Sequence, residues 1–341
     1  MDETKITPRQ SLVLQLLKTG PLSRLQIQST IKGSKVTIFR ELRTLIDLGL
    51  VISNGVGKST VYLLSDYNPL LTPPDPQFKS PASISFNFQV FNHLNHLLSP
   101  PEIKYLASIT KSLTKQLDKL NTTIARKELE RFVIELAWKS SQIEGNTYSL
   151  LETETLIKLS QEPPGHTKNE AVMILNHKSA FETIFRNRVE FKTLRVSDIH
   201  QLHNTLIKDL EVSPGVRTHP VGITGTSYHP LDNKPQITEA IDQLVACINL
   251  TNHPLEKALI AGAMIAYIQP FADGNKRTSR MLANAILMAY DYYPLSYRAV
   301  SETDYKQAII HFYEQNSIQP FKKIFLDQYE YALNNYFVTN D

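Results

Sequence analysis

The sequence predicts a mainly α-helical protein with two domains. Apolar residues recur at helical spacing along most of the chain, and β-like runs are few, chiefly near residues 50–64 and 213–233. Five prolines fall within residues 69–81, a composition that disfavours both helix and strand. With a length of 341 residues, we expect a domain over 1–66, a linker over 67–83 and a second domain over 84–341.

Composition excludes several classes of protein. The apolar fraction of 42% is ordinary for a globular chain. Cys247 is the sole cysteine, which excludes a disulfide framework and a cysteine-rich zinc site. No apolar run approaches the roughly 20 residues of a membrane span, and Met1-Asp2-Glu3 does not begin a signal-peptide pattern. We therefore expect a cytoplasmic protein without a membrane partner.

The N-terminal domain is predicted to contain three helices and a hairpin. Thr7, Ser23 and Ser34 are suitable helix N-caps, and the third helix is expected to turn Phe39, Leu42, Leu45 and Ile46 inward. Two β-like runs, 50–53 and 60–64, are joined by the glycine-containing loop 54–58. Three helices followed by a hairpin resemble a winged helix–turn–helix domain.

Positive charge is concentrated in this domain. Residues 1–66 carry a net charge of +4, whereas the rest of the chain sums to −1. The outward positions of the third helix include four residues suited to a DNA major groove, Lys35, Thr37, Arg40 and Arg43, and Lys58 in the hairpin loop can meet the DNA backbone. The domain is predicted to bind DNA sequence-specifically as part of a dimer. The alternative is a protein-contact domain whose charges are merely solvated.

The second domain is organised around residues 268–280. The apolar run 261–268 enters this stretch, Pro270 and Gly274 interrupt it, and a new helical pattern leaves it. The second helix therefore begins at residues 274–277, where free backbone N–H groups and the helix dipole favour an anion. Lys276, Arg277 and Arg280 add three cations, and Asp273 is placed to hold Mg²⁺ bound to phosphates. The alternative is a basic helix start after a capping glycine.

Residues 269–280 resemble the signature of Fic-domain proteins, His-Pro-Phe-x-Asp/Glu-Gly-Asn-Gly/Lys-Arg-x-x-Arg. The matching residues are Pro270, Phe271, Asp273, Gly274, Asn275, Arg277 and Arg280. Most Fic enzymes transfer AMP from ATP to a protein hydroxyl. The resemblance implies an all-helical core in which Asp273 holds Mg²⁺, Gly274 and Asn275 line the anion hole, Arg277 and Arg280 hold the β- and γ-phosphates of ATP, and Tyr305 lies on the adenine side.

Two residues depart from the family pattern. Gln269 stands where the family has its base histidine, and a neutral amide cannot accept the proton of a target hydroxyl. Lys276 stands where AMP-transferring members more often have glycine, whereas some phosphorylating relatives have lysine. Three functions therefore stay open: slow AMP transfer, ATP sensing by a non-catalytic transcriptional regulator, and phosphoryl transfer. His219 or His229 is a candidate substitute base, and the sequence alone leaves open whether Gln269 is natural or engineered.

A second motif precedes the core. Ser140, Glu144 and Gly145 end a predicted helix over 124–144 and resemble the inhibitory motif of those Fic proteins that carry their inhibitor before the core. The resemblance implies that Glu144 pairs with Arg280 and blocks a productive γ-phosphate position. The alternative is an ordinary surface glutamate in the last turn of a helix.

Residues 215–231 are predicted to form a β-hairpin because glycine, threonine and β-branched residues cluster there. The resemblance identifies this hairpin with the Fic flap, which aligns a protein target by edge pairing through Ile223, Thr224, Gly225, Thr226 and Tyr228. The alternative is an ordinary surface hairpin. His200 and His203, three residues apart on a predicted helix, are interpreted as structural. The expected partners are therefore nucleotide, DNA, and an unidentified protein target or a second copy of the protein in a homodimer.

Overall fold

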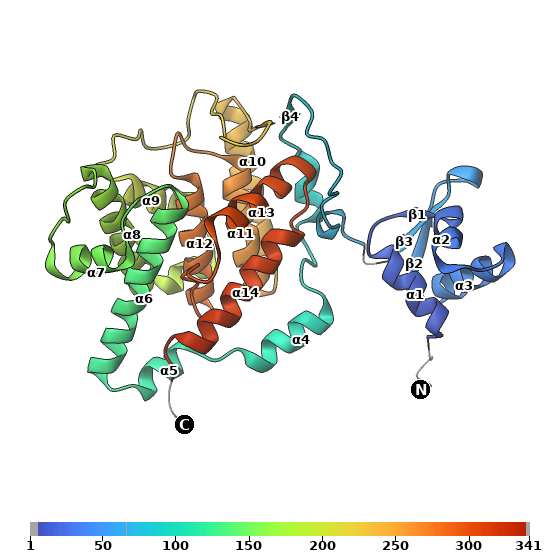
Figure 1. Ribbon diagram of the computed structural model, residues 1–341, viewed down its shortest axis with the longest axis horizontal. Coiled ribbons are helices and arrows are strands. Elements are labelled where there is room, and N and C mark those ends of the chain that lie inside the picture. Colours follow the sequence, from blue (N-terminus) through green and yellow to red (C-terminus); the bar gives the residue numbers. More distant parts are fainter. Residues whose placement is uncertain (1–5, 66, 339–341) are drawn as a thin grey trace. The chain divides into compact units, whose positions relative to one another are not determined.

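The computed structural model describes residues 6–65 and 67–338, without the side chain of Lys58. The chain divides into two compact units, Met1–Pro74 and Asp75–Asp341 (Figure 1). The segment 67–83, expected as a linker, is thus shared between them. Helices dominate, so the predicted fold class, mainly α, is confirmed. Among the described residues, no helix combines the length and the apolar character that crossing a bilayer requires.

The N-terminal unit contains the predicted three helices and hairpin. The elements are α1 (Pro8–Leu17), β1 (Leu22–Ser23), α2 (Arg24–Ile31), α3 (Lys35–Asp47), β2 (Val51–Asn54) and β3 (Val61–Leu64). The side chains of Thr7, Ser23 and Ser34 each accept a backbone N–H of the helix they precede, which explains where the three helices begin. The strands form one antiparallel sheet in the order β1-β3-β2. The likeness to a winged helix–turn–helix domain stays a prediction.

The face of α3 that packs inward differs from the expected one. Ile38, Leu42 and Leu45 are buried in the core of the unit, whereas Phe39 and Ile46 are exposed. Both sets of positions satisfy helical spacing, and only the packing against α1 and α2 selects between them. The prediction that Phe39 and Ile46 face inward is therefore wrong.

The C-terminal unit is a helical assembly with two further short strands. Its first elements are β4 (Ile84–Ser85), α4 (Pro100–Ile109), α5 (Leu113–Lys119), α6 (Thr122–Ile143), α7 (Leu150–Leu159), α8 (Lys168–Arg186) and α9 (Val196–Ile207). The remaining elements are β5 (Tyr228–His229), α10 (Lys234–Leu250), α11 (Pro254–Ile268), α12 (Asn275–Ala289), α13 (Glu302–Gln315) and α14 (Gln319–Asn335). α11 and α12 lie at its centre and are buried on nearly all sides (Figure 1). The turn between α11 and α12 belongs to the stretch 268–280, around which we expected the second domain to be organised.

The β-hairpin predicted over 215–231 is not formed. Apart from β5, the residues of this segment are irregular, and β5 pairs in parallel with β4 rather than with a neighbouring strand. Pro220 and the flanking Pro214 and Pro230 have no N–H to donate to a ladder. The Arg217 guanidinium instead binds the carbonyls of Gln269, His219 and Leu231. Two carbonyls of the segment, those of His219 and Leu231, thus have a hydrogen-bond partner without a second strand.

Candidate functional site

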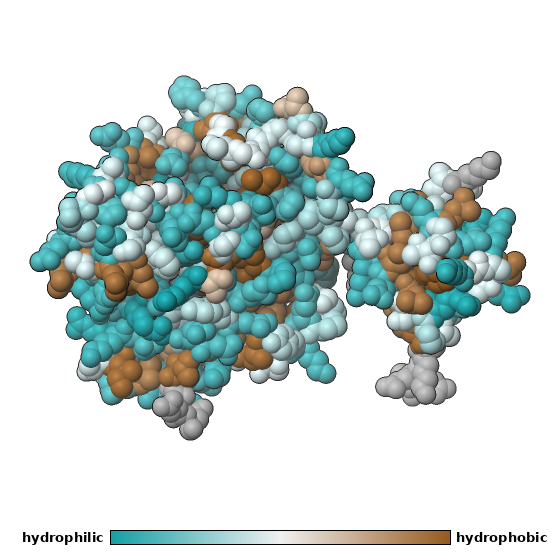
Figure 2. Space-filling view, in the orientation of Figure 1, coloured by the Kyte–Doolittle hydropathy of each residue, from teal (hydrophilic) through white to brown (hydrophobic). Residues whose placement is uncertain are grey.

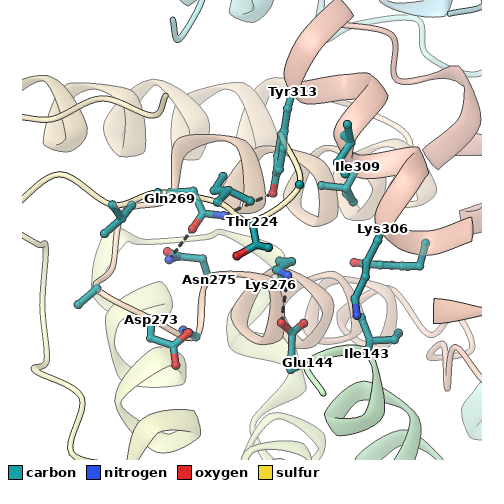
Figure 3. A pocket seen from close by; sticks show the side chains of 18 residues that line it. Ile143, Glu144, Thr224, Gln269, Asp273, Asn275, Lys276, Lys306, Ile309 and Tyr313 are labelled. Carbon is teal, nitrogen blue, oxygen red and sulfur yellow. Dashed lines mark hydrogen bonds and ion pairs between the residues drawn. The ribbon is translucent and has the colours of Figure 1, made fainter. Parts of the chain in front are cut away.

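A cavity of about 510 Å³ opens over the turn between α11 and α12 (Figure 3). The end of α6, the irregular segment 221–225 and one side of α13 complete its wall. The lining residues are Ile143, Glu144, Val221, Gly222, Ile223, Thr224, Gly225, Gln269, Ala272, Asp273, Gly274, Asn275, Lys276, Tyr305, Lys306, Ile309, Ile310 and Tyr313. The structure therefore brings the two predicted motifs, which are more than 120 residues apart in sequence, to one site.

The N-terminus of α12 forms the floor of the cavity. Gly274 is its N-cap with a left-handed φ of 80°, and a Cβ there would lie 3.1 Å from Ile207, so both conformation and space favour glycine. The Asn275 side chain exchanges two hydrogen bonds of 2.9 Å with the backbone of Phe271. The His203 ring stacks on Phe271 at 3.6 Å and its Nε2 lies 2.9 Å from the Asp273 carbonyl oxygen. The turn is thus held in one shape for a ligand.

The Gln269 side chain is already engaged by the protein. It is 7% exposed, and its Nε2 donates to the Ala266 carbonyl at 2.7 Å while its Oε1 accepts from Asn275 Nδ2 at 2.9 Å. A carboxamide in this position orders the turn but has no basic lone pair. None of the described side chains that line the cavity is a histidine. His219 and His229 lie outside the lining, so neither is placed as a substitute base.

Glu144 forms ion pairs with two of the predicted phosphate-binding cations. Its Oε1 lies 2.7 Å from Arg280 Nη2, and its Oε2 lies 3.2 Å from Lys276 Nζ (Figure 3 draws the Lys276 contact). Burial acts to raise the pKa of Glu144, but the charges of Arg280 and Lys276 outweigh it and lower the pKa to about 2. The carboxylate is therefore ionised at every working pH. Arg280 Nη1, which is buried, has no hydrogen-bond partner among the described residues.

Ser140 and His177 fix the other side of Arg280. Arg280 Nε donates to Ser140 Oγ at 2.9 Å, and Arg280 Nη2 donates to the Ser140 carbonyl at 2.9 Å. His177 Nδ1 lies 2.8 Å from the Met173 carbonyl oxygen, which can only accept, so this nitrogen carries the proton. His177 Nε2 therefore accepts from the Ser140 hydroxyl at 2.8 Å. Ser140 is thus oriented by a neutral histidine.

His177 is expected to make the core sensitive to mild acid. Burial lowers the pKa of His177 to about 3, against about 6.5 when unfolded. Stability from this group is complete above pH 6.5 and is lost as pH falls toward 3, by about 1.4 kcal/mol per pH unit. The free energy of unfolding, followed by fluorescence of the single tryptophan Trp138 on α6, should fall less steeply with acid in His177→Gln than in the wild type. The exposed His219→Gln is the matched control, and parallel profiles for all three proteins would contradict the prediction.

Arg277 is held inside the protein, and its role as a β-phosphate ligand stays a prediction. Its guanidinium is buried and donates to the Leu206 carbonyl at 3.2 Å and to Asp273 Oδ2 at 3.1 Å, and it does not line the cavity.

The Asp273 side chain, the predicted Mg²⁺ ligand, lines the cavity and is 69% exposed. Within the described ranges, no three His, Cys, Asp or Glu side chains are grouped as a metal centre. One exposed carboxylate nevertheless suits Mg²⁺ when the other ligands are phosphate and water oxygens.

The segment 221–231 borders the cavity but holds its residues differently from the predicted flap. Ile223, Thr224 and Gly225 line the cavity, whereas Tyr228 is buried and donates its hydroxyl to the Tyr267 carbonyl at 2.7 Å. Thr226 donates to Glu314 of α13 at 2.6 Å. Only the first three are therefore open to a ligand.

Four lining residues of α13 went unpredicted. Lys306, Ile309, Ile310 and Tyr313 extend the wall that begins at Tyr305. The spacing of three and four residues along one helix face was the available signal. It resembles an ordinary core stripe, and the sequence did not indicate that this face would meet the turn at 269–276.

Comparisons with known proteins relate the part of the chain that carries the cavity to the Fic/DOC family. The model of the Fic/DOC family matches residues 193–287, and the chain contains a Fic domain. Among curated proteins, it is 23% identical over 221 residues to protein adenylyltransferase fic-1 of Caenorhabditis elegans, covering 63% of this chain and 43% of that protein. It is 26% identical over 219 residues to protein adenylyltransferase Fic of Drosophila willistoni, covering 63% and 44%. The chain thus spans less than half the length of these relatives.

Solved structures show the same fold. A fragment of Fic-1 from C. elegans aligns with a TM-score of 0.57 at 23% identity, covering 69% of this chain and 72% of that one. A Fic domain-containing signaling protein from Bacteroides thetaiotaomicron aligns with a TM-score of 0.56 at 22% identity, covering 68% and 94%. These two structures therefore share the helical fold of this chain.

Proposed function

We propose that the protein is a Fic-type nucleotide-binding regulator that is held closed by its own Glu144. The observation that carries this proposal is the pairing of Glu144 with both Arg280 and Lys276 at the cavity floor. These are the cations that would otherwise meet the phosphates of ATP at the N-terminus of α12. A carboxylate that occupies them is an internal substitute for a phosphate group.

The chemistry that the site supports best is AMP transfer to a protein serine, threonine or tyrosine. The hydroxyl oxygen would bond to the α-phosphorus of ATP while the bond to the β-bridging oxygen breaks and pyrophosphate leaves. Asp273 would hold Mg²⁺, which neutralises phosphate charge. The backbone N–H groups of Gly274 and Asn275 would face the α-phosphate once the Gly274 N–H leaves Asp273 Oδ1, to which it donates at 2.6 Å in the structure. The hydroxyl proton would pass to water, because Gln269 cannot take it. We therefore infer slow transfer, with the names of the adenylyltransferase relatives as support.

The test is to incubate the protein in separate reactions with ATP labelled at the α-phosphate and with ATP labelled at the γ-phosphate, and to follow both binding and label on protein. Binding with slow labelling supports the regulator that is proposed here. Binding without any labelling supports the non-catalytic ATP sensor. Label that appears only from the γ-phosphate would support phosphoryl transfer involving Lys276, and absence of binding in a Glu144→Gly variant would refute the proposal.

We further propose that the N-terminal unit binds DNA. Lys35, Arg40 and Arg43 are exposed on α3, and no ion pair between described residues involves them. Thr37 is less available, because its hydroxyl lies 2.8 Å from Ser34 Oγ at the start of the helix. The side chain of Lys58 lies outside the described part of the chain. As a regulator, the protein should change its DNA affinity when ATP binds, and equal affinity with and without ATP would exclude that coupling.

Arg40→Ala and Arg43→Ala are each expected to weaken DNA binding and to reduce the slope of log K against log salt by about 1, because each removes one phosphate contact. Fluorescence anisotropy with duplex DNA at several salt concentrations measures both quantities. The matched control is Lys18→Ala, because Lys18 is an exposed cation that follows α1 and does not lie on α3. An unchanged salt slope in both arginine variants would argue that α3 faces another partner.

A further inference from the structure

Large apolar side chains lie exposed on α3 among its cations. Val36 is 59% exposed and Phe39 is 45% exposed. On the face of the N-terminal unit seen in Figure 2, brown apolar residues lie beside teal polar ones. Exposure of two bulky apolar residues on one short helix costs solubility and contributes nothing to the core of the unit. A binding partner that buries Val36 and Phe39 would explain why these two side chains are exposed in the free protein.

The helical geometry places these two residues in one patch with the cations. Val36, Arg40 and Arg43 are spaced by four and three residues, which puts them on the side of α3 opposite the buried Ile38, Leu42 and Leu45. Phe39 is three residues from Val36 and four from Arg43, so it borders the same stripe. We call Val36, Phe39, Arg40 and Arg43 the α3 patch.

The charge of the α3 patch favours a polyanion over an apolar protein surface. Its two arginines, with the neighbouring Lys35, form no ion pair among the described residues. A duplex offers phosphates to such cations. On the base edges of its major groove, the apolar group is the C5-methyl of thymine. Val36 lies in the first turn of α3, and the first residues of a recognition helix are those that meet base edges.

We infer that Val36 and Phe39 read thymine methyl groups, so that the DNA site of this protein contains A·T pairs where these side chains enter the groove. The inference rests on the proposed DNA-binding function and adds the chemistry of recognition. Arg40 and Arg43 hold the duplex by its phosphates, and the two apolar side chains discriminate among bases. No polar side chain of the patch is required for this discrimination.

The experiment first selects duplexes from a random pool with the full chain, and then replaces each selected thymine in turn by 2′-deoxyuridine. This replacement removes one methyl group and leaves every hydrogen-bonding group in place. One buried methyl is worth about 0.8 kcal/mol, so the Kd of the wild type should rise about fourfold at one or two positions. Val36→Ala should bind the thymine duplex more weakly and should be insensitive to deoxyuridine at one of those positions. Leu12→Ala, exposed on α1, should keep the full sensitivity.

The possible failures are distinguishable. If no duplex is enriched, the DNA-binding part of the proposed function fails and the inference falls with it. If a duplex is enriched but deoxyuridine leaves the Kd unchanged at every position, DNA binding stands and the methyl readout is wrong. Equal deoxyuridine sensitivity in the wild type, Val36→Ala and Phe39→Ala would likewise overturn the inference, and the exposed apolar side chains would then belong to a protein contact.

Discussion

Glu144→Gly is expected to raise the affinity for ATP by about 10- to 100-fold, which is the usual size of the effect that one coupled site has on the affinity of another. In the wild type the carboxylate occupies Arg280 and Lys276, so ATP must displace it and also meets its charge. The variant frees both cations for the phosphates. Isothermal titration calorimetry with ATP measures the change.

AMP is the internal control for this prediction, because it has no γ-phosphate and should gain much less affinity than ATP. Glu144→Gln is the matched variant: it keeps the size of the side chain and removes only its charge, so it should show an intermediate gain. Without nucleotide, Glu144→Gly should also unfold at a lower temperature, since Arg280 is left buried without its partner. Equal ATP affinity in the wild type and both variants would show that Glu144 does not guard the site.

The inhibitory contact should persist across the physiological pH range. With a pKa of about 2, Glu144 keeps its charge until pH falls well below 4. The difference in ATP affinity between the wild type and Glu144→Gly should therefore be constant between pH 5.5 and 8.5. On the proposed function, we therefore expect the site to be released by a conformational change of α6 or by a change in its surroundings rather than by a change in pH.

The parts of the site that lie together in sequence were predictable. Residues 269–280 form a turn and the first residues of α12, and their proline, glycine and cations carry their own conformational and electrostatic signals, which the structure places at one helix N-terminus. The pairing of Glu144 with Arg280 was suggested only by family resemblance, because no local rule connects residues 136 positions apart. The interaction of His177 with Ser140 had no sequence signal at all.

Where the prediction failed, competing interactions decided the outcome. Residues 215–231 have the composition of a hairpin, but their prolines have no N–H to donate to a strand ladder, and the buried Arg217 guanidinium binds the carbonyls of His219 and Leu231. On α3, Phe39 and Ile38 are adjacent, and either fits a helical period. The choice depends on the volume that α1 and α2 leave for a side chain, which the periodicity of one helix does not contain.

Introducing a histidine at position 269 is expected to have the largest effect on chemistry. In a Glu144→Gly background, Gln269→His should raise the rate of AMP transfer by about 100- to 10,000-fold, the usual value of general-base catalysis. Gln269 lines the cavity and its side chain contacts that of Asn275, so a histidine ring placed there would face the phosphates of the proposed ATP. The rate of AMP transfer is measured as the transfer of label to protein from ATP that is labelled at the α-phosphate.

Gln269→Ala in the same background separates the two meanings of that result. If the histidine variant alone is labelled rapidly, the cavity is an AMP-transfer site that Gln269 has silenced, and its natural use is to sense nucleotide. If the glutamine, alanine and histidine proteins label at the same rate, proton removal does not limit the reaction and the chain is an adenylyltransferase without a base at this position. The difference matters for the DNA-binding role that we propose for the N-terminal unit. A silenced site could act on that role only through nucleotide binding, whereas an active site could also modify a partner or the protein itself.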